Sequence, residues 1–253
     1  MPANYFYTQA AYNWIELAGD AAATLIVGSG NHWANPFDLA GHTFTHYGTV
    51  YSGSTAVMCS MSGLVSLGPG GWYNGNVNGD MIHNPGYPSP GYGNPLPAIC
   101  PLWNDYYGNN PPNNSLIGKI VAGGTNGLPA GNSWLVIEWN GVMMLPSDLN
   151  LISFEVQMQL DTSPNNGDLI FQYKQLHPTL GPSAASIGLT TGAASGGTAT
   201  NYNVSSYNQA NPLAANGQAM LWRYSSTGLP PGGAAVPTLI AAVQGAQPSS
   251  GGF

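Results

Sequence analysis

Residues 154–160 read Phe-Glu-Val-Gln-Met-Gln-Leu, and residues 169–173 read Leu-Ile-Phe-Gln-Tyr. The first stretch alternates strictly between apolar and polar side chains, which predicts a β-strand with one buried and one solvated face. Residues 161–168 between them are rich in Asp, Asn, Pro and Gly, and the pair Asn166-Gly167 supplies a positive backbone φ at low cost. The sequence therefore predicts a β-hairpin here, with Glu155 on the solvated face.

The same rhythm extends along the chain and indicates an all-β fold. The 35 Gly and 21 Pro residues leave no helical pattern longer than two turns, while short apolar runs recur between turn residues. We expect an antiparallel β-sandwich, jelly-roll-like in its layers. The expected strands are residues 12–17, 22–27, 42–45, 56–61, 64–67, 99–103, 116–121, 133–139, 152–160, 169–175, 186–189 and 219–224.

Two segments break this rhythm and set the expected domain organisation. Residues 1–227 form the predicted sandwich, in which residues 68–97, rich in Gly, Pro, Asn and Tyr, are a long surface insertion. Residues 228–253 form a hinge and a C-terminal arm, whose apolar residues include Leu239, Ile240 and Val243. Such an arm either completes the sheet edge of a neighbouring copy or folds back on its own domain.

Charge excludes several classes of partner. The chain has three basic residues against ten acids, a net charge of -7, and only 5% charged residues, where ordinary domains carry about 25%. Three cations cannot neutralise a run of phosphates, so we expect no binding to nucleic acid or to anionic membranes. A polar but uncharged surface suits contacts with further copies of the same chain.

The N-terminus and the cysteines bear on cellular location. Residues 1–4 lack the basic start and apolar core of a secretory signal, and no stretch has the roughly 18 apolar residues of a membrane span. The sequence thus predicts neither Sec export nor membrane insertion, and release by lysis would bring such a chain outside the cell. Cys59 and Cys100 fit either a disulfide or two buried free thiols.

A series of short motifs lies on the expected strands between residues 44 and 222. The motifs are Phe-Thr-His-Tyr-Gly at 44–48, Ser-Gly-Leu-Val-Ser-Leu-Gly at 62–68, Leu-Trp-Asn-Asp at 102–105, Val-Ile-Glu-Trp-Asn-Gly-Val at 136–142, Phe-Glu-Val at 154–156, Phe-Gln-Tyr at 171–173 and Asn-Gly-Gln-Ala-Met-Leu-Trp at 216–222. This series resembles a β-sandwich module that is repeated in large secreted bacterial proteins, and the resemblance covers residues 12–223. It implies a non-catalytic appendage for adhesion or carbohydrate contact, although Asn104 replaces one of two acids that the module carries.

The sequence carries none of the common catalytic or metal-binding motifs. The chain has no Gly-x-Ser-x-Gly elbow, His-Glu-x-x-His helix, Cys-x-x-Cys pair or phosphate-binding loop. Residues 74–80 imitate the start of a calcium loop, but Pro85 stands where the loop needs its Glu. Glu138 and Glu155 lie on predicted strands and could face one another like a glycosidase pair, yet the alternation favours a solvated Glu155. We therefore expect no catalytic residue, no metal and no cofactor.

Aromatic residues are the candidate ligand-binding groups, because their rings can stack on sugars. They are Trp72, Tyr73, Tyr87, Tyr92, Tyr106 and Tyr107. The alternative for the insertion residues is packing of a proline-rich loop against the sandwich or a neighbour. The function we expect is that of a non-enzymatic, self-assembling subunit of a virion surface or another extracellular assembly; the alternative is a glycan-binding adhesion module.

Overall fold

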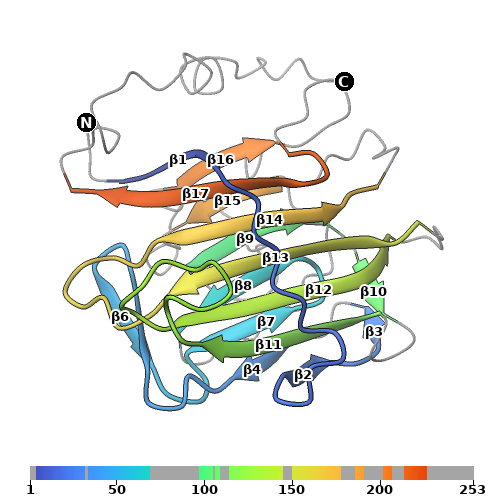
Figure 1. Ribbon diagram of the computed structural model, residues 1–253, viewed down its shortest axis with the longest axis horizontal. Coiled ribbons are helices and arrows are strands. Elements are labelled where there is room, and N and C mark those ends of the chain that lie inside the picture. The colour runs from blue at the N-terminus through green and yellow to red at the C-terminus, as the bar shows by residue number, and fades with distance from the viewer. Residues whose placement is uncertain are drawn as a thin grey trace, which may run out of the picture.

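The computed structural model describes residues 4–31, 34–68, 97–104, 106–108, 114–144, 150–177, 186–190, 202–206 and 214–226. These residues form two facing antiparallel sheets and a separate hairpin (Figure 1). The expected antiparallel β-sandwich is confirmed; the jelly-roll character stays a prediction. The predicted insertion and the C-terminal arm, with Leu239, Ile240 and Val243, lie outside the described residues.

The larger sheet has nine strands, and five of them follow one another in the order β1-β17-β14-β13-β12. Beyond β12 the sheet divides: β12 pairs with β11, which pairs with β2, and it also pairs with β10, which pairs with β3. Its strands are β1 (Asn4–Ala10), β2 (Thr24–Val27), β3 (Gly30–Asn31), β10 (Tyr106–Gly108), β11 (Ser115–Val121), β12 (Trp134–Met144), β13 (Ile152–Gln159), β14 (Leu169–Gln175) and β17 (Gln218–Ser225). The predicted hairpin is present as β13 and β14.

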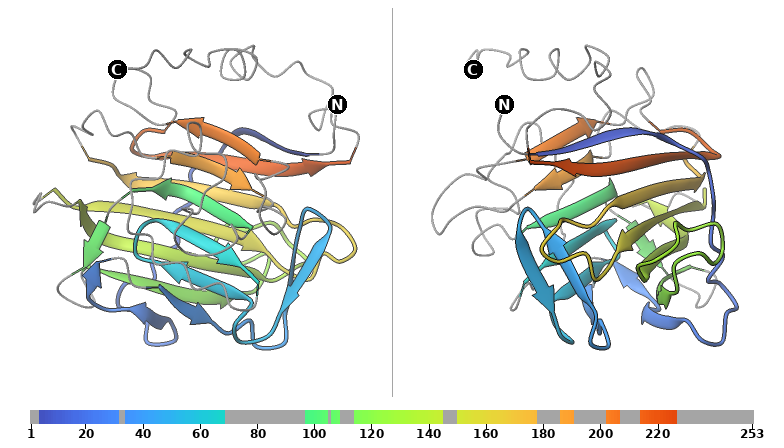
Figure 2. Two further views of the ribbon diagram at one scale, coloured as in Figure 1. Left: turned by 180° about the vertical axis from the view of Figure 1, so that it is seen from behind. Right: turned by 60° about the vertical axis from the view of Figure 1, so that its left-hand side comes forward.

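The smaller sheet has six strands in the order β16-β15-β9-β8-β7-β4 and covers one face of the larger sheet (Figure 2). Its strands are β4 (Ala34–Phe37), β7 (Val57–Ser60), β8 (Leu64–Leu67), β9 (Ala98–Trp103), β15 (Ser186–Thr190) and β16 (Tyr202–Ser206). The remaining strands, β5 (Thr43–His46) and β6 (Thr49–Ser52), pair only with each other. Sequence reasoning missed β1, β3, β4, β6, β10 and β16.

The main core lies between the two sheets. Trp139 of β12 stacks on Phe154 of β13 with 4.7 Å between ring centroids, and both side chains are fully buried. The Trp139 indole Nε1–H donates to the Ser60 carbonyl at 2.9 Å, which ties β12 to β7 of the opposite sheet. Tryptophan suits this place because it fills the core and still satisfies a buried carbonyl.

The loop between β13 and β14 differs from its expected turn chemistry. Positive φ falls on Asp161, at 57°, and not on Gly167. Glycine is needed at position 167 because the backbone there passes close to that of Gln159: a Cβ would lie 2.3 Å from the Gln159 carbonyl oxygen. The Asp161 carboxylate binds His42 Nδ1 at 2.6 Å and accepts the Thr43 N–H at 3.0 Å, so this loop holds the β5–β6 hairpin.

The two cysteines are free buried thiols. Cys59 belongs to the main core, whereas Cys100 lies in a separate apolar cluster with Leu64 and Trp103. β8 separates their strands β7 and β9 in the sheet. In the part of the chain that the structure describes, no helix is long and apolar enough to cross a membrane.

Candidate functional site

Residues 11–17 form a strap across the outer face of the larger sheet, not the strand that we expected at 12–17. β1 pairs at one edge of the sheet and β2 pairs near the other, so the connecting chain must cross the strands between them (Figure 1). The backbone groups of those strands are already bonded to one another. The strap must therefore satisfy its own N–H groups through side chains.

Three side chains on successive strands supply those partners. The Asn13 N–H donates to Gln172 Oε1 on β14 at 2.9 Å. The Ile15 N–H donates to Glu155 Oε1 on β13 at 3.4 Å, and the Leu17 N–H donates to Glu138 Oε2 on β12 at 2.7 Å. Each step of two residues thus advances the strap by one strand.

Glu138 and Glu155 are partners across β12 and β13, and both are fully buried. The prediction of a solvated Glu155 is wrong, because the strap covers the face that the alternation had marked as wet. Gln157, next on the same face of β13, donates to Glu155 Oε1 and to the Asn13 carbonyl. The alternation therefore identified the two faces of β13 correctly, but it did not show that the strap covers the polar face.

Burial dominates the acid–base behaviour of this pair. It raises the pKa of Glu138 to about 7, with the charge of Glu16 acting in the same direction and the Leu17 N–H and the charge of Lys174 opposing it. Burial also raises the pKa of Glu155 well above its usual value, although the Gln157 side chain opposes this. Burial therefore favours the neutral form of both carboxyl groups, and Glu138 is close to its midpoint at neutral pH.

Glu16, on the exposed side of the strap, has the opposite behaviour. Burial would raise its pKa, but the hydrogen bond and the charge of the Lys174 ammonium and the hydrogen bond from the Trp14 indole lower it overall. The Lys174 Nζ also lies 5.1 Å from the centre of the Trp14 ring. Lys174 therefore fastens the strap from outside, while Glu138 and Glu155 hold it from beneath.

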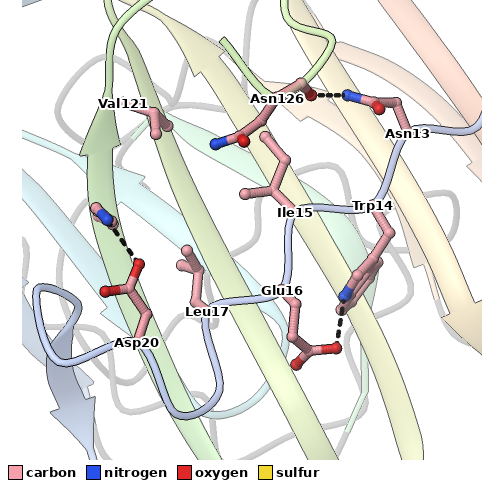
Figure 3. Close-up of a pocket in the computed structure, with 9 residues that line it drawn as sticks. Asn13, Trp14, Ile15, Glu16, Leu17, Asp20, Val121 and Asn126 are labelled. Atoms are coloured by element: carbon pink, nitrogen blue, oxygen red, sulfur yellow. Dashed lines mark hydrogen bonds and ion pairs between the residues drawn. The ribbon is translucent and has the colours of Figure 1, made fainter.

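A shallow depression of about 350 Å³ lies beside the strap, against the loop between β11 and β12 (Figure 3). Its polar groups bond mainly to one another: the Asn13 amide donates to the Asn126 carbonyl, and Lys119 Nζ binds Asp20 at 2.6 Å. Ile15 contributes an apolar wall. These bonds fix the two segments relative to each other.

All three basic residues of the chain form ion pairs within it. Besides Lys119 and Lys174, Arg223 of β17 binds Asp168 at 2.8 Å. Exposed ion pairs of this kind contribute little to the stability of the fold. The pairs also change the charge of the surface, because each cation lies beside an anion of the same chain that offsets it.

The candidate aromatic residues do not form one described site. Tyr106 is fully buried, with its ring centroid 5.6 Å from that of Phe154, so it cannot stack on an external sugar. Tyr107 is half-buried on β10. The remaining four, Trp72, Tyr73, Tyr87 and Tyr92, lie outside the described residues, as does the calcium-like stretch 74–80.

Metal ligands are not gathered in the described part of the chain, where no cluster of three or more His, Cys, Asp and Glu side chains could hold an ion. His42 is paired with Asp161, and His46 is buried and stacked on Tyr5 at 5.4 Å. The sequence indicated that Glu138 and Glu155 could face one another, as they do, but it did not connect them with Gln172 or with the strap. A row of polar residues at the same height on three neighbouring strands is the signal that could have revealed it.

Comparison with known proteins places the chain in one family. No curated protein and no solved structure matches it. A family model described as NIDO related matches residues 4–224, which run from the first strand of the larger sheet to its last. The chain therefore belongs to the NIDO-related family.

Proposed function

We propose that the chain is a non-enzymatic structural subunit of an extracellular assembly, such as the surface of a virion. Membership of the NIDO-related family indicates an extracellular domain. The virion setting and the assembly are the proposal. It rests chiefly on one observation: Lys119, Lys174 and Arg223, the three basic residues of the chain, each pair with an acid of the same chain.

The buried carboxylates support a structural role for this site. Glu138 and Glu155 are the pair that a glycosidase reading would need, but each has an oxygen occupied by a strap N–H and neither is exposed. A substrate would have to displace the strap to reach them. Their geometry serves to hold residues 11–17 on the sheet.

The ion pairs support assembly through neutral contacts. Because Lys119, Lys174 and Arg223 each face an acid of the same chain, contact with another copy would rest on shape, hydrogen bonding and apolar area. Such contacts avoid the desolvation cost of burying ions. The apolar residues Leu239 and Ile240 of the C-terminal segment are the proposed link between copies.

The test compares natively purified full chain with a chain ending at Thr227, by mass photometry and negative-stain electron microscopy. We expect large regular particles from the full chain and smaller species from the shortened one. The particles should persist between low and high salt, because neutral contacts are not screened. A monomer in both samples, with a mass of 26.3 kDa for the full chain, would refute assembly. Glycan binding would then be the function to test, with Trp72→Ala as the variant.

A further inference from the structure

The chain contains six Asn-Gly pairs, and the structure describes four of them: Asn126-Gly127, Asn140-Gly141, Asn166-Gly167 and Asn216-Gly217. An asparagine followed by glycine is chemically labile, because the glycine nitrogen can attack the side-chain amide carbon and close a five-membered ring. Glycine has no Cβ to obstruct that attack. The reaction needs a glycine N–H and an asparagine side chain that are not held in hydrogen bonds.

Two of these pairs are protected because the glycine N–H is a donor in the folded chain. The Gly141 N–H, within β12, donates to Ser153 Oγ at 2.9 Å. The Gly167 N–H donates to the Thr45 carbonyl at 3.0 Å, where the loop between β13 and β14 meets the β5–β6 hairpin. In both places the nitrogen must first give up its hydrogen bond before it can attack.

The pair before β17 is exposed but is held by two hydrogen bonds. The Gly217 N–H donates to the Tyr173 carbonyl at 2.8 Å. The Asn216 side-chain oxygen accepts the Leu176 N–H at 2.7 Å, which fixes the group that would be attacked. Exposure therefore does not make Asn216 reactive.

Neither reacting group of the fourth pair is held in this way. Asn126 and Gly127 lie in the exposed loop between β11 and β12. Among the described residues, the Asn126 side chain has no hydrogen-bond partner and the Gly127 N–H has no acceptor. The Asn126 main-chain carbonyl is bonded instead, because it accepts a hydrogen bond from the Asn13 amide of the strap (Figure 3).

The hydrogen bond from Asn13 acts on the peptide group that would react. The Asn126 carbonyl and the Gly127 nitrogen belong to the same peptide group. A donor on the carbonyl oxygen polarises the amide and draws electron density from its nitrogen, so the Gly127 N–H becomes easier to deprotonate. The strap therefore favours the nucleophilic form of this nitrogen and leaves the Asn126 side chain free.

We propose that Asn126 is a site of spontaneous deamidation in the folded protein. Solvent base removes the proton of the Gly127 N–H, and the nitrogen forms a bond to Asn126 Cγ. The Cγ–N bond of the side-chain amide breaks, and the amide nitrogen takes a proton from solvent and leaves as ammonia. Water then opens the succinimide at either carbonyl carbon, which gives an aspartyl or an isoaspartyl residue at position 126.

The modification changes the surface beside the strap. Both products add a negative charge to the depression, whose charged lining residues are Glu16, Asp20 and Lys119. The isoaspartyl product also inserts one carbon into the backbone next to Gly127. The loop has no room for it there, because even a Cβ on Gly127 would lie 2.6 Å from Asn13 Oδ1. The contact between the loop and the strap must therefore shift.

The test follows all six Asn-Gly pairs of the full chain during incubation at mildly alkaline pH in H₂¹⁸O, by peptide mapping with mass spectrometry. The isotope enters each product when the succinimide opens, so it separates reaction during incubation from reaction during digestion. Peptides with Asn74 and Asn78, which lie outside the described residues, are read separately. A parallel sample in urea gives the rate at each position without the fold.

Asn216 is the matched control for Asn126. Both are exposed, and the glycines that follow them have nearly equal positive φ, 74° at Gly217 and 73° at Gly127. In the native chain we expect Asn126 to react about thirtyfold faster than Asn216, because two hydrogen bonds of ordinary net strength must break at Asn216. In urea the two rates should be similar.

Three results would overturn the proposal. One is equal rates at Asn126 and Asn216 in the native chain. Another is an unmodified Asn126 in the native chain after a time that fully converts it in urea. The third is a difference between the two positions that persists in urea, because the selectivity would then come from the neighbouring sequence and not from the fold.

Discussion

Replacing Glu138 by Gln should stabilise the protein at neutral and alkaline pH. Glutamine keeps an oxygen that can accept the Leu17 N–H, and it cannot ionise. In the native protein the pKa of Glu138 is raised from 4.5 to about 7. The neutral form of this side chain is therefore favoured by folding, and its ionisation works against the folded state.

The sign and size of the effect follow from that shift. The contribution of Glu138 to stability is fully present below about pH 4.5, where the carboxyl is neutral whether the chain is folded or not. It is lost as the pH rises through about 7. A difference of about 2.5 pKa units corresponds to about 3 kcal/mol. The variant should therefore match wild type near pH 4 and exceed it by about 3 kcal/mol at pH 8.

Urea unfolding of both proteins, followed by tryptophan fluorescence between about pH 4 and pH 8, measures this difference. Subtracting the two curves removes the titration of groups elsewhere in the chain, such as Asp161, whose pKa is lowered. Equal stability of variant and wild type at pH 8, or a variant that is less stable there, would refute the account of the buried carboxyl.

Three further outcomes are expected. Trp139→Phe should lower the free energy of unfolding by about 1–3 kcal/mol, because a buried carbonyl of the opposite sheet loses its donor; urea unfolding measures it. Gly63→Ala should lower Tm far more than Gly53→Ala, because both glycines have positive φ but only at Gly63 would a Cβ lie 2.0 Å from a backbone oxygen of β9; similar losses would contradict this. Cys59 and Cys100, whose thiol pKa values burial raises, should resist a thiol reagent in the native state and yield two thiols after unfolding.

Strand positions followed from the sequence wherever apolar residues alternated or ran together between turn residues. β8 and β14 begin and end where the pattern predicted. β1 was missed because Tyr, Gln and Thr on an edge strand carry little alternation, and its pairing with β17 depends on the far end of the chain. Local pattern cannot report a partner so distant in sequence.

The site was harder to predict than the fold, for a physical reason. The strap residues Tyr12 to Leu17 look like a strand, and only the position of both edges of the sheet shows that they must cross it. Without that crossing, the polar residues of an alternating strand such as β13 are expected to point into solvent. Burial of Glu155 is thus a property of the whole topology.

The pairing of β1 with β17 also constrains the order of events during synthesis. Among the described strands, residues 4–10 leave the ribosome first, and their partner, residues 218–225, leaves last. The strap likewise has nothing to dock on until β12, β13 and β14 have formed their sheet. The N-terminal segment must therefore wait, extended and without its partners, and its docking is expected to be a late step that completes the folded domain.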